Sequence, residues 1–96
     1  MKLNEVYLSY IRSKPCAVCG KMGVHPHHME ARGMGGNNLS GEKDYFCVPL
    51  CAEHHTEVGW SYEDFRTNYG VDLWKDVAHL QREFFLPIIN NAGESK

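Results

Sequence analysis

The sequence predicts one α+β domain over residues 1–96, with a zinc-stabilised core of two strands and a helix and with flanking N- and C-terminal helices. The first observation behind this class is length, because a chain of 96 residues forms a single domain with a small apolar core. The second is a pair of cysteine-containing motifs, since a bound metal can supply stability that a small core lacks. The third is the order of periodic segments, in which a helix precedes two strands and further helices follow.

The composition indicates a globular protein, and the net charge limits its partners. A hydrophobic fraction of 43% and a charged fraction of 23% are ordinary for a folded domain. A formal net charge of −2 argues against a protein that coats nucleic acid without sequence preference, because such domains are usually basic. It is compatible with an enzyme whose bound divalent cation adds local positive charge.

Neither a membrane anchor nor a secretion signal is expected. No apolar run has the length of a membrane span, and the N-terminus lacks the basic and apolar regions of a signal peptide. We therefore expect a cytoplasmic protein. In that compartment, clustered cysteines are metal ligands more often than disulfides.

The first two predicted elements are a helix and a metal-binding turn. Residues 3–13 have apolar side chains at helical spacing, and Pro15 ends the helix, which we expect to pack on the zinc-stabilised core. The next segment contains Cys16 and Cys19 with two residues between them, and such a pair can bind one ion from a tight turn. Gly20 permits the positive φ that such a turn often needs. A redox-active pair is the weaker alternative, because no β-α-β pattern surrounds the motif.

Two strands are predicted to form a hairpin around a long loop. Residues 24–30 form the first strand, in which Pro26 indicates an edge position or a bulge. Residues 32–41 are rich in Gly and Asn, as expected for a loop, and long loops in small domains are often functional. Residues 45–50 form the second strand, which returns antiparallel to the first.

Three helices complete the chain. The first occupies residues 51–58, where a glycine follows its last turn. The second has Ser61 as its N-cap. The third covers residues 72–86 and is closed by Pro87, so that the polar tail, residues 90–96, is expected to fray.

Four side chains in the two cysteine motifs form a predicted zinc site: Cys16, Cys19, Cys51 and His54. Three thiolates and one imidazole suit a tetrahedral zinc ion with no open position. His54 follows Cys51 by three residues, so both lie on one face of the predicted helix. Cys47 is the alternative fourth ligand, although its place within a strand favours a buried thiol.

Three histidines remain beyond those that the zinc site needs: His27, His28 and His55. Adjacent residues of a strand point to opposite faces, so we expect His27 and His28 to have different roles. One can bind a second, catalytic cation, and the other can act as a base, because an imidazole with a pKa near about 6.5 can activate water at neutral pH. His55 is turned about 100° from His54 and should face the hairpin. The alternative is that these histidines are extra zinc ligands or surface residues.

The segment from Cys16 to His55 resembles the HNH endonucleases, the ββα-metal nucleases, and is most similar to their small, zinc-bearing phage-type members. The resemblance is carried by Cys16-x-x-Cys19, His27-His28, Gly33-Met34-Gly35-Gly36, Asp44 and Pro49-Leu50-Cys51-x-x-His54-His55. It implies a treble-clef-like, ββα-metal core over residues 16–58. The helices at residues 3–13 and 61–86 would then pack around this core.

The resemblance also implies a role for each matching histidine. His27 takes the place of the first metal ligand, His28 that of the general base and His55 that of the last metal-binding histidine. The sequence departs from the family where Gly59 occupies the position of a further histidine, one helical turn after His55. The second cation is therefore expected to have two protein ligands. This favours Mg²⁺ or Mn²⁺, because such ions retain bound water.

The middle position of the family motif is usually an asparagine that orients the base. Asp44 most nearly fills it, and Asn37 or Asn38 is the alternative. Arg32 and Lys43 are candidates for holding neighbouring phosphates, although each can equally be a solvated loop charge.

The implied activity is metal-assisted hydrolysis of a phosphodiester bond in double-stranded DNA. His28 would deprotonate water, while the cation stabilises the leaving 3′ oxygen. A monomer or weak dimer with one site would nick one strand per event. Two other functions remain open. One is a non-catalytic treble-clef module that binds nucleic acid or a protein partner and needs none of the surplus histidines. The other is a redox-sensing zinc switch, which predicts reversible disulfides among its cysteines.

Overall fold

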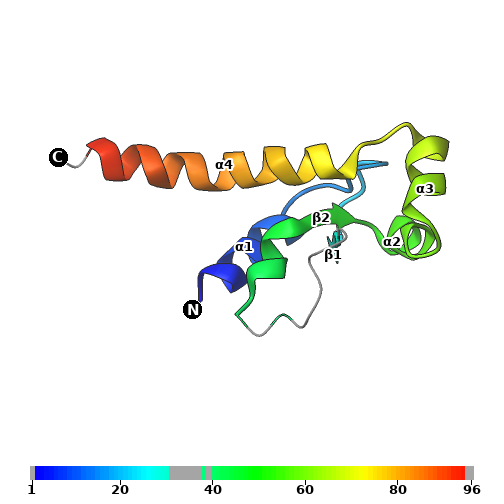
Figure 1. The fold of residues 1–96 in the computed structure, drawn as a ribbon, viewed down its shortest axis with the longest axis horizontal. Coiled ribbons are helices and arrows are strands. Elements are labelled where there is room, and N and C mark those ends of the chain that lie inside the picture. Colours follow the sequence, from blue (N-terminus) through cyan, green and yellow to red (C-terminus); the bar gives the residue numbers. More distant parts are fainter. Residues whose placement is uncertain (1, 31–37, 39, 95–96) are drawn as a thin grey trace.

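The computed structural model describes residues 2–30, 38 and 40–94. Within these residues the fold is a small α+β domain with a two-stranded sheet and four α-helices (Figure 1). The order of elements is α1 (Leu3–Arg12), β1 (His25–His28), the 3-10 helix η1 (Glu42–Phe46), β2 (Cys47–Leu50), α2 (Ala52–Val58), α3 (Tyr62–Tyr69) and α4 (Leu73–Glu94). The predicted order of a helix, two strands and further helices is therefore correct.

The hairpin of β1 and β2 fixes which histidines share a face. The strands are antiparallel, and the register pairs His25 with Leu50, Pro26 with Pro49, His27 with Val48 and His28 with Cys47. Directly opposed residues point to the same face of a sheet, and alternate residues of a strand do likewise. His25 and His27 therefore share one face of the hairpin, and His28 belongs to the other.

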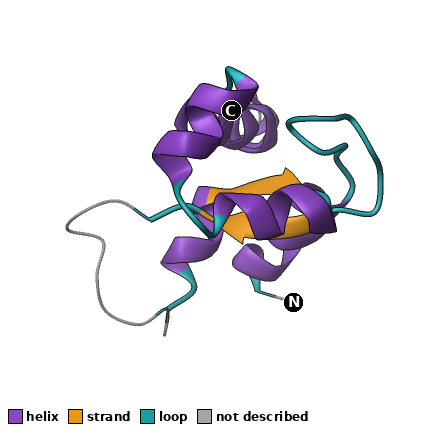
Figure 2. Cartoon of the chain, turned by 90° about the vertical axis from the view of Figure 1, so that its right-hand side faces the viewer, coloured by secondary structure: helices purple, strands orange, loops and turns teal. Residues whose placement is uncertain are grey.

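Two clusters of buried side chains cover the two faces of the hairpin. Val48 and Leu50 belong to the larger cluster, which they form with residues of the last three helices: Val58, Phe65, Leu73 and Val77. Cys47 belongs to the smaller cluster, together with Tyr7 and Ile11 of α1. Figure 2 shows helices on both sides of the two strands. The face of His25 and His27 is thus the one on which α2 packs, and the face of His28 is the one next to α1.

The segment before β2 differs from the prediction. Residues 45–50 were expected to be one strand, but the strand begins at Cys47 and is preceded by η1. Gly41 adopts a left-handed conformation with φ 76°, and the Asp44 amide donates a hydrogen bond to its carbonyl. This turn draws the Asp44 side chain into the interior, where it is 7% exposed. The first residues of the predicted strand therefore form part of a 3-10 helix instead.

The N-cap of α3 agrees with the prediction, but the end of the last helix does not. The Ser61 hydroxyl accepts a hydrogen bond from the Asp64 amide. In contrast, α4 continues through Pro87 to Glu94, so the prediction that Pro87 closes the helix and that residues 90–94 fray is wrong. Proline cannot donate the helical hydrogen bond, but its fixed φ is close to the helical value. Pro87 lies on an exposed part of the helix, where water can hydrate the carbonyl that lacks a partner.

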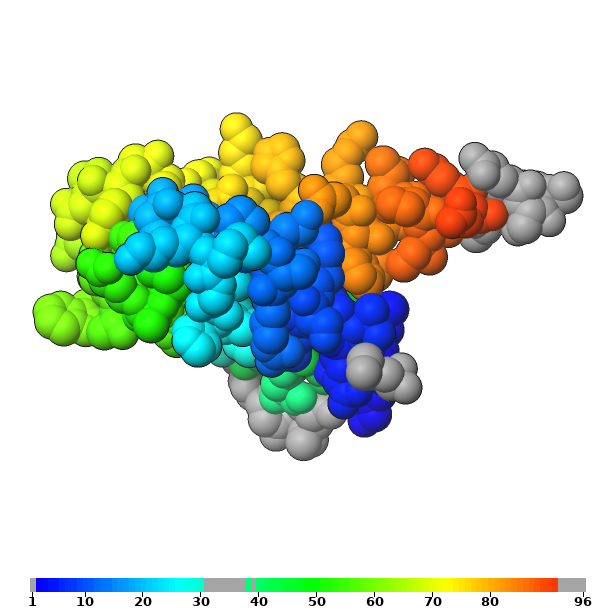
Figure 3. Space-filling model, turned by 180° about the vertical axis from the view of Figure 1, so that it is seen from behind, coloured from blue at the N-terminus to red at the C-terminus, as the bar shows by residue number. Residues whose placement is uncertain are grey.

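The C-terminal part of α4 extends past the body of the domain (Figures 1 and 3). Leu86, Ile88 and Ile89 are exposed in this part. Closer to its start, α4 is attached to α1, because the Tyr10 hydroxyl donates hydrogen bonds to the Leu80 carbonyl and the Glu83 carboxylate. None of the described helices is both long and apolar enough to cross a lipid bilayer.

Candidate metal centre and histidine site

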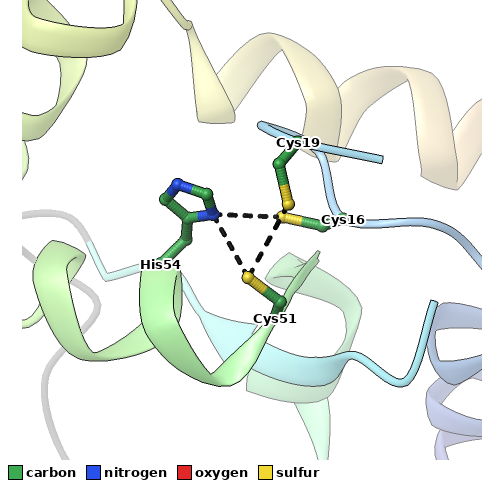
Figure 4. A group of neighbouring side chains, drawn as sticks. All are labelled: Cys16, Cys19, Cys51 and His54. Carbon is green, nitrogen blue, oxygen red and sulfur yellow. Dashed lines mark hydrogen bonds between the residues drawn. The ribbon is translucent and has the colours of Figure 1, made fainter. Parts of the chain in front are cut away.

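The structure brings the four predicted zinc ligands together. The ligand atoms of Cys16, Cys19, Cys51 and His54 all lie within 4.8 Å of one another (Figure 4). The Cys16 Sγ–His54 Nδ1 and Cys19 Sγ–Cys51 Sγ distances are 3.7 and 3.8 Å, and Cys51 Sγ lies 3.2 Å from His54 Nδ1. Around a tetrahedral zinc ion, neighbouring ligand atoms are separated by roughly 3.5–3.8 Å. The group can therefore hold a metal ion such as zinc.

Local backbone structure explains how these ligands converge. Gly20 has φ 77°, and its amide donates a hydrogen bond to the Cys16 carbonyl, which closes the turn. The Ala17 amide donates to the Pro49 carbonyl over 2.9 Å, which attaches this turn to the end of β2. Cys51 is the N-cap residue of α2, and His54 lies in the first turn of that helix. The site thus joins the segment after α1 to the start of α2.

The Cys16 thiol is prepared for metal binding. Burial alone would raise its pKa, but hydrogen bonds from the backbone amides of Cys19, Cys51 and Val18 outweigh that effect and lower the pKa to about 6. A thiolate, rather than a thiol, is the form that binds metal. At neutral pH this side chain is therefore already in the form that a zinc ion requires.

Cys47 lies apart from the four ligands. Its side chain is fully buried in the cluster with Tyr7 and Ile11. Burial and the nearby Asp44 carboxylate raise the pKa of this thiol to about 12. Cys47 is therefore a core thiol, as its place in a strand favoured.

The two adjacent histidines of α2 point in different directions. His54 is buried with the cysteines, and its ring lies 5.0 Å from that of Tyr69. The ring of His55 lies 5.2 Å from that of His27, at an interplanar angle of 84°. The two side chains differ in direction as expected for neighbouring residues of an α-helix, which are about 100° apart around its axis. The structure thus places His55 and His27 side by side, with one on α2 and the other on β1.

His28, on the opposite face of β1, is hydrogen-bonded to Asp44. The His28 Nε2–Asp44 Oδ1 distance is 2.8 Å. The Asp44 carboxylate also accepts hydrogen bonds from the side-chain amides of Asn4 and Asn38, at 2.8 and 2.9 Å. Burial alone would raise the pKa of Asp44, but the hydrogen bonds from Asn4, His28 and Asn38 outweigh it and lower the pKa below its usual value. Asp44 is therefore a buried carboxylate that orients the His28 ring.

The environments of the two strand histidines suit different chemistry. The His28 side chain is 42% exposed, so that water can reach its ring. The pKa of His27 is lowered to about 4, first by burial and then by the neighbouring His55 and His28. His27 is consequently neutral at physiological pH, which is the protonation state that a metal ligand needs.

Two residues that sequence reasoning missed also belong to this site. Asn4 lies on α1, 40 positions from the carboxylate that it contacts, and no local pattern could have indicated that pair. His25 lies on the same face of β1 as His27, and its ring is 6.1 Å from that of His55. The alternating directions of strand residues could have indicated His25.

The predicted residues of the long loop divide into two groups. Arg32, Asn37 and the glycine-rich segment at residues 33–36 lie outside the described residues. Asn38 is described, and it contacts Asp44 rather than His28. The Lys43 ammonium forms an ion pair with Glu30 at 3.2 Å.

Comparisons with known proteins identify a family. The family model described as "Protein of unknown function (DUF968)" matches residues 1–85. The "Uncharacterized protein YdfU" of Escherichia coli (strain K12) is 35% identical over 71 residues, which cover 74% of this chain and 20% of the relative. The chain therefore spans about a fifth of the length of that relative. No solved structure matches the chain. Because the family match covers most of its residues, the chain belongs to the DUF968 family.

Proposed function

We propose that this chain is a metal-dependent DNA endonuclease of the HNH type, with a zinc-bearing, treble-clef-like ββα-metal core. The observation that carries the proposal is the pair of different histidine environments on β1. His28 is hydrogen-bonded to the buried carboxylate of Asp44, whereas His27 lies on the other face beside His55. A zinc module that only binds a partner has no need for either arrangement.

The Cys₃His group would have a structural role. A zinc ion there would fix the Cys16–Cys19 turn and the first turn of α2 to each other. Since the same turn of α2 contains His55, this cross-link would also set the position of His55 relative to β1. The structural ion would thereby maintain the spacing of the second site.

His28 would act as the general base. Asp44 accepts the Nε2–H hydrogen bond, which leaves Nδ1 as the ring atom that can take a proton from water. The water oxygen then attacks the phosphorus, the bond to the 3′ oxygen breaks, and the proton stays on His28. The Asp44 carboxylate stabilises the resulting imidazolium, as the aspartate does in a catalytic triad.

His27 and His55 would hold the second cation. A bound Mg²⁺ or Mn²⁺ would supply positive charge to the scissile phosphate and to the leaving 3′ oxygen. His27 is suited to this role because it is neutral at pH 7. Double-stranded DNA is the proposed substrate, and a monomer or weak dimer with one such site would release nicked product.

The proposal is tested by incubating zinc-loaded protein with supercoiled plasmid and added Mg²⁺ or Mn²⁺. We expect conversion to the nicked circular form, and a loss of about 10²–10⁴-fold in His28→Ala. His79→Ala is the matched control, because His79 is an exposed histidine on α4. Binding of DNA without cleavage by the wild-type protein would instead support the non-catalytic module. Equal cleavage by His28→Ala and His79→Ala would exclude His28 as the base.

A further inference from the structure

We propose that His25 is a third protein ligand of the second metal site, which is then a three-histidine site formed by His25, His27 and His55. This inference rests on the proposed function, because that function places a cation at His27 and His55. It adds a ligand and, with it, a different preference among metal ions.

The strand places His25 where such a ligand is needed. His25 and His27 are two residues apart on β1 and lie opposite Leu50 and Val48, on the face of the hairpin that packs against α2. His55 projects toward this face from α2. The three imidazoles therefore come from two elements, β1 and α2.

One ring separation is that of two imidazoles on a shared ion, and the His25 ring lies farther from His55. Two imidazoles whose nitrogens each lie about 2 Å from one ion have ring centroids roughly 5 Å apart. His27 and His55, at 5.2 Å, already satisfy this condition. The His25 and His55 ring centroids are 6.1 Å apart, so the His25 ring has to move closer to share the ion.

His25 has the freedom to make this movement. It is an exposed residue at the first position of β1, directly after a segment that contains Gly23. Figure 3 shows the cyan segment that includes β1 at the molecular surface, next to the green part of the chain. Rotation is open to an exposed side chain, and the backbone of the strand already places His25 on the face of His27.

α2 offers no third ligand one helical turn after His55. One turn after His55 stands Gly59, which has no side chain. A ligand from the strand would replace the one that α2 lacks. The site would then have three nitrogen ligands and open positions for water and a phosphate oxygen.

Three imidazoles change which ion is preferred. Mg²⁺ is a hard cation that prefers oxygen ligands, whereas imidazole suits transition metals such as Zn²⁺, Ni²⁺ and Co²⁺. We therefore expect the second site to select a transition metal over Mg²⁺. Mn²⁺, which accepts nitrogen more readily than Mg²⁺ does, should support cleavage better.

Metal binding can be measured independently of cleavage. Zinc-loaded protein is titrated with Co²⁺, and the visible absorption of nitrogen-ligated Co²⁺ is followed, while thiolate charge-transfer bands in the near ultraviolet report any exchange at the Cys₃His group. We expect one Co²⁺ per chain beyond the zinc. His25→Gln and His55→Gln should each weaken this binding by at least tenfold, since even outer-sphere partners of a metal are worth about 10–100-fold.

His79→Gln is the matched control and should bind Co²⁺ as the wild type does, because His79 lies on α4. His25→Asp provides a second test, since a charged carboxylate at this position should bind Mg²⁺ more tightly than the neutral amide of His25→Gln does. Wild-type Co²⁺ affinity in His25→Gln, with weakened binding in His55→Gln, would overturn the three-histidine site and leave the proposed nuclease intact. Tight, His25-dependent Co²⁺ binding without any cleavage would instead support the site and contradict the nuclease.

Discussion

The His28 ring and the Asp44 carboxylate are joined by a hydrogen bond of 2.8 Å, although the two residues belong to different elements on either side of the long loop. Asp44 is nearly inaccessible to solvent, whereas His28 is partly exposed. A buried anion that holds an accessible imidazole is an arrangement that promotes proton abstraction. The same carboxylate is also bound by two amides, so it has a structural role in addition to a chemical one.

Substitutions of Asp44 should separate these two roles. In Asp44→Asn the side chain keeps its shape and one oxygen acceptor, so we expect cleavage to fall but to remain measurable. The carboxylate charge should matter because it stabilises the His28 imidazolium that forms during the reaction. Plasmid nicking by both proteins at pH 7 under the same conditions checks this statement. An Asp44→Asn protein with an unchanged rate would show that the charge has no part in the reaction.

Asp44→Ala should be more damaging to stability than Asp44→Asn. It removes the acceptor of the half-buried Asn4 amide and of the exposed Asn38 amide, and a typical hydrogen bond contributes about 0.5–1.5 kcal/mol. Urea unfolding at pH 7 should therefore rank the wild type above Asp44→Asn and Asp44→Asn above Asp44→Ala. Asn4→Ala is the matched control, since it removes one of the donors and leaves the carboxylate bonded to His28.

The stability of the domain should depend on pH through His27. Its pKa is about 4 in the folded chain, and a histidine in an unfolded chain has a pKa near about 6.5. The unfolded state therefore binds more protons between these values, so the free energy of unfolding should be unaffected by His27 above about pH 6.5 and should fall as the pH drops from there to about 4. Denaturation of zinc-loaded protein without a second metal tests this. The free energy of unfolding of the wild type minus that of His27→Gln should vary with pH across this window. The same difference should stay constant from pH 7 to pH 8.

Much of the metal centre could be predicted from residue spacing, because close-spaced ligands depend on local geometry. Cys16 and Cys19 lie in one turn, and Cys51 and His54 lie in one helical turn, so the spacing within each pair depends on local backbone geometry alone. The opposite orientations of His27 and His28 follow in the same way from strand geometry. In these cases short-range rules were sufficient.

The remaining features depend on contacts between distant parts of the chain or on small differences in free energy between alternative local structures. The Asn4–Asp44 hydrogen bond joins α1 to η1, and only the packing of those two elements reveals it. Pro87 was expected to end α4, but the loss of one hydrogen bond on an exposed stretch was insufficient to stop the helix. The second strand was predicted to begin at residue 45, two residues too early, because the turn at Gly41 and the buried Asp44 carboxylate favour a 3-10 helix there.

Cys47 provides a test of which cysteines bind the metal. Cys47→Ser should keep its zinc but lose about 1–3 kcal/mol of stability, because the new hydroxyl replaces a fully buried thiol in an apolar cluster. Cys16→Ser should lose zinc, since Cys16 belongs to the Cys₃His group. Zinc content by atomic spectroscopy and the melting temperature of both variants distinguish these effects. A Cys47→Ser protein without zinc would assign the fourth ligand to Cys47 instead of His54.

The adjacent residues His54 and His55 should have separate roles in stability and activity. His54 is buried with the cysteines, whereas His55 lies beside His27 on the hairpin side of α2. His54→Ala should lose zinc and much of its thermal stability, because metal binding contributes directly to folding in a domain with a small core. His55→Ala should retain zinc and the fold but lose cleavage that depends on the second cation.

The two variants control for each other, because each removes one imidazole from the same short helix. Zinc content, melting temperature and plasmid nicking are measured for both proteins under the same conditions. Loss of zinc and stability in one variant, with loss of nicking alone in the other, is the expected pattern. If His55→Ala releases zinc while His54→Ala remains folded and active, the two histidines have the reverse roles. The side-by-side arrangement of His27 and His55 would then be a packing contact, because the ion at the Cys₃His group would require His55 to turn away from the hairpin.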